Sequence, residues 1–524
     1  MVCAMPFKFV RAALRSISPI AALSLAMSAP IAAGQILERG NGPEPDSLDP
    51  QRAQGLSAQQ ILRDLYEGLT RIDERGETVM AAAASVTVDR QGRRWCFQLR
   101  PDLRWSDGQA MTAADFIAGL ERALAPQTLA PYSALLTPLQ GATAKLAGEA
   151  AAVSGLSTPD AHTVCTLLEQ ATPDWAARLA LPLAMPFRDG PLTERPYNGA
   201  YRLLQARPHS HVLLERNSHY GGVRPGRIEQ VRYHVTDDAA AELNRYAAGE
   251  LHLTETLPPG QLERLQDRYG EQIKVGPAYA SYYYGFNLTQ PPFRDNLPLR
   301  QALSLALDRQ VLTRFISAGG ELPLAVLVPP LPGQPNNADV SQQRELARQR
   351  YAQAGYGEDR PLTVELRFNT GLSHRRMALA VAAQWREVLG VHTVLRHEEW
   401  KVFVSNRRSR RLTQVFRAGW VADYVDPLSF LEGFASDSAL NAVGYANPEF
   451  DRLISLASGE TDRQRRAQQL QAAEGLLLDD QVILPIYAYT SKHLVSPALC
   501  GFKIHPLDHH PSADLYFCAQ GDRP

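Results

Sequence analysis

The N-terminal segment restricts what the rest of the chain can become. Basic residues up to Arg15 precede an apolar stretch over residues 17–31 that two prolines interrupt, and Ala32-Ala33-Gly34 follow. This order is typical of a secretory signal peptide, so we predict that residues 1–33 are removed near Ala33 or Gly34. A membrane anchor is the alternative, but the stretch is short and broken by proline. The mature chain is then expected to fold outside the cytoplasm, most simply in the periplasm.

Export places the cysteines in an oxidising compartment. Cys3 lies before the apolar stretch, so it is not positioned for lipid attachment, and Cys96, Cys165, Cys500 and Cys518 remain. An even number of cysteines in such a compartment favours disulfides. Cys96 and Cys165 lie in strand-like runs, whereas Cys500 and Cys518 flank a loop, so we favour these two pairs among three connectivities. No CxxC spacing indicates zinc or redox chemistry.

Size and charge exclude several classes of protein. A chain of 524 residues is too long for one hydrophobic core, so two or three domains are expected. Lys and Arg number 54 against 55 Asp and Glu, which leaves a formal net charge of −1. This balance provides no overall basic field for nucleic acid or membrane lipid. No stretch after the leader is long and apolar enough to cross a bilayer.

The segment FRAGWVADYVDP, residues 416–427, combines several binding features. Its start is typical of a short buried strand, and Gly419 lets another backbone approach closely. Aromatic residues flank Asp423 and are expected to desolvate its carboxylate, which then needs a cation. Arg417 provides the opposite charge, so the segment offers partners for both ends of a zwitterion. The alternative is that Asp423 and Arg417 pair with each other or with the scaffold.

This segment resembles the ligand-binding strand of the periplasmic oligopeptide-binding proteins, which are the receptors of peptide ABC importers in the peptide/nickel class of solute-binding proteins. The family pattern is R-A-G-W-x-A-D-Y-x-x-P. The resemblance implies that Asp423 binds the α-ammonium group of a peptide. It also implies that the main chain around Gly419, Trp420 and Val421 pairs with the peptide backbone, while Arg417 balances the peptide carboxylate.

Further family motifs follow in order over nearly the whole mature chain. They are S-L-D-P at 47–50, W-S-D-G at 105–108, N-G-A-Y at 198–201, P-P-F-R-D at 291–295 and N-T-x-x-x-H at 369–374. The resemblance implies an α/β fold of the type II periplasmic-binding-protein class, with two lobes, an extra third domain and mixed sheets flanked by helices. The implied discontinuous limits are 34–66, 184–278 and 491–524 for domain I, 67–183 for domain II and 279–490 for domain III.

The resemblance also implies further ligand-binding residues. His374 heads a helix, where the dipole attracts an anion, and it would meet the peptide carboxylate; a solvated helix cap is the alternative. Arg408 matches a second family arginine, although the basic run 407–411 leaves that register open. The other implied residues are Gln54, Gly55 and Leu56 through their main chain, Asn369 in the histidine motif, and Trp400, Tyr132, Tyr487 and Tyr489 as aromatic lining.

The expected function is therefore capture of short peptides between two lobes and delivery to membrane permease subunits. The protein is expected to act as a monomer, without a cofactor and without nucleic acid. Murein tripeptides, dipeptides, nickel chelates and opines remain alternative ligands on the same fold. Glu255 stands where known relatives carry an asparagine; it would favour basic peptide side chains if it faced the cleft, and a solvated glutamate is the simpler interpretation.

Two other classes of function fit the sequence less well. A secreted peptidase or amidase is disfavoured because no GxSxG elbow, HExxH motif or suitable Cys–His arrangement is present. A metal carrier would have to use His505, His509 and His510 with Asp508 near the C-terminus. We expect these side chains to be solvated at the surface and predict no metal site.

Overall fold

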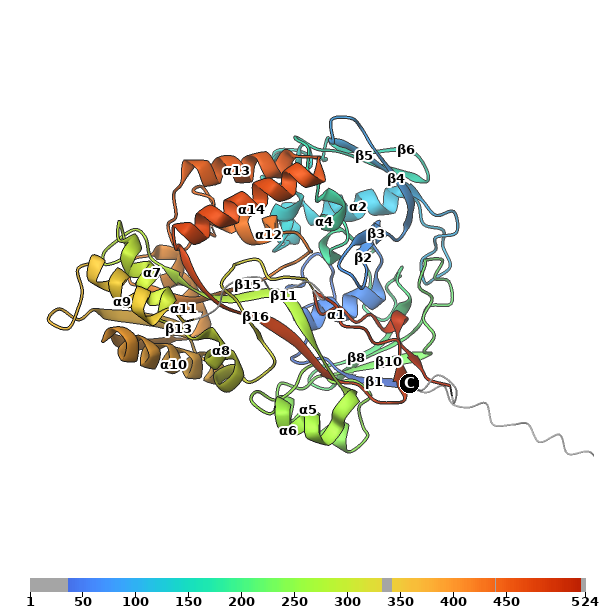
Figure 1. Ribbon diagram of the computed structural model, residues 1–524. Coiled ribbons are helices and arrows are strands. Elements are labelled where there is room, and N and C mark those ends of the chain that lie inside the picture. Colours follow the sequence, from blue (N-terminus) through green and yellow to red (C-terminus); the bar gives the residue numbers. More distant parts are fainter. Residues whose placement is uncertain (1–35, 332–341, 439, 520–524) are drawn as a thin grey trace, which may run out of the picture.

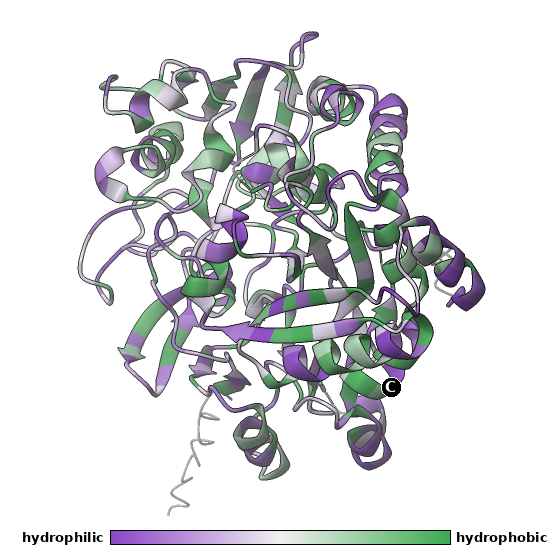
Figure 2. Cartoon of the chain, turned by 90° about the vertical axis from the view of Figure 1, so that its left-hand side faces the viewer, coloured by the Kyte–Doolittle hydropathy of each residue, from purple (hydrophilic) through white to green (hydrophobic). Residues whose placement is uncertain are grey.

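The computed structural model describes residues 36–331, 342–438 and 440–519 of the protein. Three sheets, of four, four and six strands, each carry their own hydrophobic core, and two small two-stranded sheets accompany them (Figure 1). In Figure 2 hydrophobic colour gathers on the strands, whereas many helices carry both colours. Within these described ranges, no helix is long and apolar enough to cross a membrane. The protein thus has a mixed α/β architecture of several sheets flanked by helices.

The first sheet joins segments that lie far apart in the sequence. Leu37 pairs with Val231 in a parallel arrangement of the first and last strands of this region. Ile61, Leu62 and Leu65 of α1 are fully buried beneath the sheet, because their spacing places them on one face of the helix. The strand order is β1 (Ile36–Gly40), β10 (Gln230–His234), β9 (His211–Arg216) and β8 (Tyr201–Arg207), and α1 spans Leu56–Leu65.

The second sheet contains the first disulfide. Cys96 lies directly opposite Cys165, and the Cα–Cα distance of 4.1 Å accompanies an S–S bond, which confirms the predicted pair. Thr112 caps the helix α2 (Ala113–Ala123) with Asp115 in a capping box. The strand order is β4 (Ala83–Val88), β5 (Arg94–Leu99), β7 (Thr163–Leu167) and β6 (Leu156–Asp160).

The third sheet is buried on both faces. Tyr282 and Tyr284 of β11 belong to one core together with helices α7 and α10, whereas Tyr283 packs in another core with α13 and α14. Successive side chains of a strand point to opposite faces, so an unbroken aromatic run suits this position. The strand order is β12 (Leu322–Pro323), β16 (Ile483–Leu494), β11 (Ile273–Phe286), β15 (Val415–Val421), β13 (Thr363–Asn369) and β14 (His392–Glu398).

Two long strands, β11 and β16, run from the third sheet toward α5 and α6 (Figure 1). Their pairing is interrupted after Pro277 opposite Thr490 and resumes at Ser281 opposite Ala488. The expected limits between domains I and III, after residues 278 and 490, fall at this irregularity and stay a prediction. Near the other end of the chain, a second disulfide joins Cys500 to Cys518, and it confirms the remaining predicted pair.

The other elements connect or cover these sheets. Gly390 has a φ of 70° at the C-cap of α10. The helices are α3 (Ala142–Leu146), α4 (Trp175–Arg178), α5 (Ala239–Ala247), α6 (Leu262–Tyr269), α7 (Leu297–Leu305), α8 (Arg309–Val311), α9 (Arg344–Gln353), α10 (Leu372–Leu389), α11 (Trp400–Ser409), α12 (Leu428–Leu431), α13 (Pro448–Gly459) and α14 (Arg463–Asp479). The short strands are β2 (Thr70–Ile72), β3 (Thr78–Met80), β17 (Leu499–Cys500) and β18 (Tyr516–Phe517). Single helical turns occupy Pro126–Thr128, Ser133–Leu136, Pro182–Ala184, Gly270–Gln272, Leu312–Ser317, Glu432–Phe434 and Ser512–Asp514.

Candidate ligand-binding site

Strand β15 has one open edge. On one side it pairs with β11 along its whole length, from Val421 opposite Ala280 to Val415 opposite Phe286. On the other side it pairs with β13 only at Val415 and Phe416. Beyond Phe416, residues 417–421 therefore have no strand partner on that side in the described part of the chain. Such an edge is a template for an added strand.

The direction of the free hydrogen-bonding groups follows from the strand geometry. The N–H of Ala422 donates to the carbonyl of Tyr279 in β11 at 3.2 Å. Because the N–H and C=O groups of successive strand residues alternate in direction, those of Arg417, Gly419 and Val421 face the open side. This edge thus presents three residues to a ligand backbone.

Gly419 is required by its immediate surroundings. A Cβ at this position would lie 3.0 Å from the carbonyl oxygen of Ser281 and 3.3 Å from the hydroxyl oxygen of Tyr489. The first contact is with backbone, which cannot move aside easily. A larger side chain would therefore shift β15 or the tyrosine beside it, so glycine keeps the edge straight and open.

Arg417 is held at the start of the open edge by aromatic residues. Its guanidinium donates to the hydroxyl of Tyr489 at 2.7 Å and lies over the ring of Tyr282, with 5.1 Å to the ring centroid. No ion pair joins it to Asp423 or to another carboxylate of the described chain. Arg417 and Asp423 thus do not pair with each other. Of the alternative, pairing with the scaffold does occur for Arg417, through Tyr489 and Tyr282, but no carboxylate among the described residues neutralises its charge.

His374 joins this aromatic group from the first turn of α10. Its ring stacks on Tyr282 at 5.8 Å, and its Nδ1 lies 3.5 Å from the Tyr282 hydroxyl oxygen. Tyr487 stacks on Tyr282, with 4.6 Å between the ring centroids, and it meets Tyr489 edge to face at 5.3 Å. Burial, reinforced by the charge of Arg417, lowers the pKa of His374 to about 4. The structure thus brings the predicted residues Arg417, His374, Tyr487 and Tyr489 together, with the histidine neutral at pH 7.

Asp423 lies at the opposite end of the segment. Its side chain is half-buried and lines a cavity of about 20 Å³ with Tyr132 and Gln59. Burial raises the pKa of Asp423, and the positive charge of Arg63 in α1 opposes that rise. Among the described residues, no hydrogen bond or ion pair to the Asp423 carboxylate occurs. The carboxylate is therefore partly desolvated without a direct partner, which is the state expected of an ammonium-binding group.

The predicted main-chain contacts at Gln54, Gly55 and Leu56 have a different environment. The N–H groups of Gln54 and Gly55 donate to the carboxylate of Asp46 at 2.7 and 3.0 Å. The Tyr132 hydroxyl donates to the Gln54 carbonyl at 3.4 Å, which brings this loop next to the cavity of Asp423. Leu56 is exposed at the start of α1. In this structure Asp46 thus occupies the donors that were expected to serve a ligand.

The consecutive residues Arg407 and Arg408 of helix α11 have different surroundings. Arg408 and the half-exposed Trp400 line an open groove of about 540 Å³. Arg407 instead lies over the ring of Phe403, 5.8 Å from its centroid, and burial together with the charges of Arg417 and Arg408 lowers its pKa, although Tyr283 opposes this. The structure therefore brings Arg407, rather than Arg408, toward Arg417.

Several buried polar atoms at this edge have no hydrogen-bond partner among the described residues, including Arg417 Nε and Ser281 Oγ. Two more belong to Trp420 and Asn369: the indole nitrogen of Trp420 and the amide oxygen of Asn369, which ends β13. Buried polar groups are almost always paired, so each such atom calls for an explanation. Both residues were predicted to bind the ligand, and a bound ligand or water would supply the partner.

Two expectations about exposed residues are wrong. Glu255 is half-buried rather than solvated: its carboxylate accepts from Gln60 at 3.1 Å, and burial, with the charge of Asp508, raises its pKa to about 8. His505 and His510 are also buried, with 4% and 7% of their surface exposed, because the C-terminal loop packs against β16 instead of lying in solvent.

Comparison with known proteins agrees with this architecture. The model of the bacterial extracellular solute-binding proteins, family 5, matches residues 77–442. The probable deoxycholate-binding periplasmic protein YgiS of Escherichia coli is 33% identical and covers 96% of the chain, and 97% of that relative is covered. The periplasmic oligopeptide-binding protein OppA of the same organism is 32% identical, with 94% of the chain and 95% of the relative covered.

Solved structures give the same result. The unliganded open form of MppA, a periplasmic murein tripeptide binding protein, has a TM-score of 0.82 at 31% identity and covers 93% of this chain and 98% of its own. OppA of Haemophilus influenzae in complex with RPPGFSPFR has a TM-score of 0.74 at 29% identity, covering 93% and 99%. The fold predicted from the motifs is thus confirmed. The chain belongs to the family 5 bacterial extracellular solute-binding proteins.

Proposed function

We propose that the protein is a periplasmic receptor that captures short peptides and delivers them to a membrane ABC permease. The observation that carries this proposal is the open edge of β15, with Arg417 at one end and the unpaired Asp423 at the other. A peptide has the same three features: a backbone able to form a strand, an ammonium group and a carboxylate. Periplasmic relatives that bind oligopeptides and murein peptides support this function.

The charges also define how the peptide lies. With its ammonium group at Asp423 and its carboxylate toward Arg417, the peptide runs antiparallel to β15. Six residue steps separate these two positions, so their Cα atoms are at most roughly 20 Å apart at about 3.3 Å per step. Arg417, His374 and Arg407 then offer alternative partners to the carboxylates of peptides of different length. Backbone pairing provides affinity with little dependence on the peptide sequence.

Closure of the lobes would complete the site. The structure resembles the unliganded open form of a relative, and β11 and β16 form the connection about which two lobes can rotate. Closure would bring the loop of Gln54 and Gly55 over the peptide, and Asp46 would then release its two N–H groups. We propose that the protein acts as a monomer and leaves its ligand chemically unchanged.

A bile acid is a second candidate ligand, because one relative is named as a probable deoxycholate-binding protein at similar identity. Asp423 argues against it. A bile acid has a carboxylate but no amino group, so it would leave the desolvated Asp423 without a cation. A murein tripeptide keeps its amino group, and its additional carboxylates could be met by Arg417 and Arg407.

Calorimetric titration of the mature protein with three ligands tests the proposal. We expect a free tripeptide to bind, the same tripeptide with an acetylated amino terminus to bind far more weakly, and deoxycholate to bind weakly or not at all. Equal affinity for the free and acetylated peptides, or tight binding of deoxycholate alone, would contradict the assignment of Asp423 and of the peptide ligand.

A further inference from the structure

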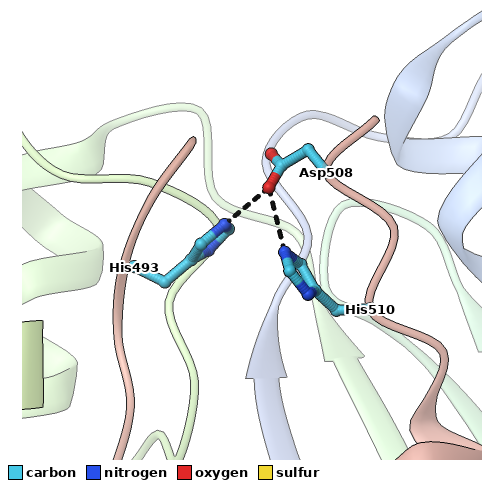
Figure 3. A group of neighbouring side chains, drawn as sticks. All are labelled: His493, Asp508 and His510. Carbon is cyan, nitrogen blue, oxygen red and sulfur yellow. Dashed lines mark hydrogen bonds and ion pairs between the residues drawn. The ribbon is translucent and has the colours of Figure 1, made fainter. Parts of the chain in front are cut away.

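A second group of polar side chains lies where β16 meets the C-terminal loop, outside the site described above. The Nε2 atoms of His493 and His510 both lie 2.9 Å from the same oxygen of Asp508 (Figure 3). The Ser491 hydroxyl also contacts this oxygen. The three ligand-type atoms of His493, Asp508 and His510 all lie within 4.8 Å of one another. None of these residues lines the cavity beside Asp423.

The hydrogen bonds of His493 fix the state of its ring. Its Nδ1 lies 2.8 Å from the carbonyl oxygen of Thr254, which only accepts, so Nδ1 carries a proton. In the neutral ring, Nε2 then presents its lone pair to the Asp508 carboxylate. Two lone pairs 2.9 Å apart repel each other, and a second proton or a metal ion between them would remove that repulsion. The Ser491 hydroxyl, 3.0 Å from Nε2, can donate to only one of the two atoms. A histidine that binds a metal through one ring nitrogen commonly donates a hydrogen bond from the other nitrogen to a backbone carbonyl, as Nδ1 of His493 does here.

The surroundings hold the two histidines in place, whereas the Asp508 side chain is 34% exposed. His493 is 1% exposed, and the ring of His510 stacks on Phe502 at 4.4 Å. The backbone carbonyl of His510 accepts from Arg39 at 2.8 Å. Ligand side chains that are fixed before an ion arrives lose little conformational freedom when they bind it.

We propose that His493, Asp508 and His510 form a binding site for a divalent transition-metal ion of the zinc type. Two imidazole nitrogens and one carboxylate oxygen are a common zinc donor set, whereas calcium and magnesium prefer oxygen ligands alone. A tetrahedral ion with bonds of about 2.0–2.1 Å separates its ligand atoms by roughly 3.3 Å. The two His–Asp distances of 2.9 Å are a few tenths of an ångström shorter than this value, and all three atoms lie within 4.8 Å, so the side chains would have to shift to hold the ion.

An access route and a structural consequence accompany the site. His510 lines a cavity of about 470 Å³ that includes His505, His509 and Arg63, so an ion can approach from that side. A bound ion would join β16 to the C-terminal loop that is itself closed by the second disulfide. β16 also carries Tyr487 and Tyr489, so the ion would stiffen a strand that reaches the peptide edge. This inference goes beyond the proposed peptide function and does not depend on it.

Metal titration of the untagged, metal-free mature protein tests the proposal. We expect one zinc ion to bind per chain, with no competition from magnesium. Asp508→Asn and His510→Gln should each weaken zinc binding by more than about 100-fold, the upper end for loss of an outer partner alone. His509→Gln is the matched control from the same loop, and it should bind zinc as the wild type does.

The visible spectrum of the cobalt-loaded wild type provides a measurement that needs no variant. Tetrahedral coordination gives an intense ligand-field band, and this band should disappear when one equivalent of zinc is added. If the wild-type protein takes up no zinc at micromolar concentration, the three side chains are bridged by protons alone, and the proposal is overturned. Wild-type affinity in folded His510→Gln, or equal losses in His509→Gln and His510→Gln, would overturn it as well.

Discussion

At the scale of single residues, the central feature is a carboxylate that the protein itself does not neutralise directly. Asp423 is partly desolvated, and Arg63 acts on it only through space. We predict that Asp423→Asn weakens tripeptide binding by about 2–5 kcal/mol, the range for removing one partner of a buried charged hydrogen bond. Calorimetry measures this loss. Asp437→Asn, at an exposed carboxylate, should leave affinity unchanged, and an equal loss in both variants would contradict the specific role of Asp423.

His374 gives a prediction about pH. Its pKa falls from an ordinary 6.5 to about 4 in the folded protein, so the unfolded chain binds the proton more readily. Stability from the neutral ring is therefore present above pH 6.5 and is lost as the pH falls toward 4. We expect His374→Gln to lose less stability than the wild type between pH 7 and pH 4.5 in urea unfolding. Parallel pH curves for the two proteins would show that the ring is not held neutral.

Sequence reasoning at this scale succeeded where the pattern is local. The short buried strand at the start of the segment 416–427 and the helix that His374 heads each depend on residues within a few positions. The approach of Arg407 to Arg417 was missed because one helical step turns a side chain by about 100°, and spacing alone does not fix the rotation of α11. The role of Asp46 was missed because an aspartate in a turn gives no distinctive signal.

At the scale of elements, β15 keeps an open edge because β13 pairs with it only as far as Phe416. We predict that Val421→Pro weakens peptide binding, since it removes an N–H on the open side while the pairing with β11 is kept. One backbone hydrogen bond corresponds to about 0.5–1.5 kcal/mol. Ala422→Pro is the matched comparison, because it removes the N–H that donates to Tyr279.

Two measurements separate these variants. Thermal unfolding should show a larger loss for Ala422→Pro, and peptide titration a larger relative loss for Val421→Pro. If Val421→Pro binds peptide as the wild type does, the open edge is not the ligand strand. The motif around Asp423 could predict this strand from the sequence, but the open edge depends on where β13 diverges, which no local pattern contains.

Strand pairing explains why the group of His493, Asp508 and His510 was not predicted from the sequence. Asp508 and His510 were recognised together because they are close in sequence. His493 was not, because its position beside them follows from the pairing of β16 with β11 over many residues. The burial of this loop likewise results from its packing on β16, so His505 and His510, which were expected at the surface, lie in the interior.

At the scale of the whole molecule, we predict that peptide binding changes the shape of the protein. The structure resembles an open, unliganded relative, and a peptide that bridges two lobes stabilises the closed form. Small-angle X-ray scattering should therefore show a smaller radius of gyration when tripeptide is added to the wild type. Asp423→Asn should need a higher peptide concentration for the same change. Binding without compaction would contradict closure about β11 and β16.

Native mass spectrometry of the mature protein, purified without denaturation, tests the central claim most directly. Trapped ligand is released and sequenced. The account predicts a set of short peptides with free amino termini and varied side chains, because backbone pairing and Asp423 recognise features common to all peptides. A single ligand without an amino group, such as a sterol-type carboxylic acid, would contradict the account while leaving the fold unchanged.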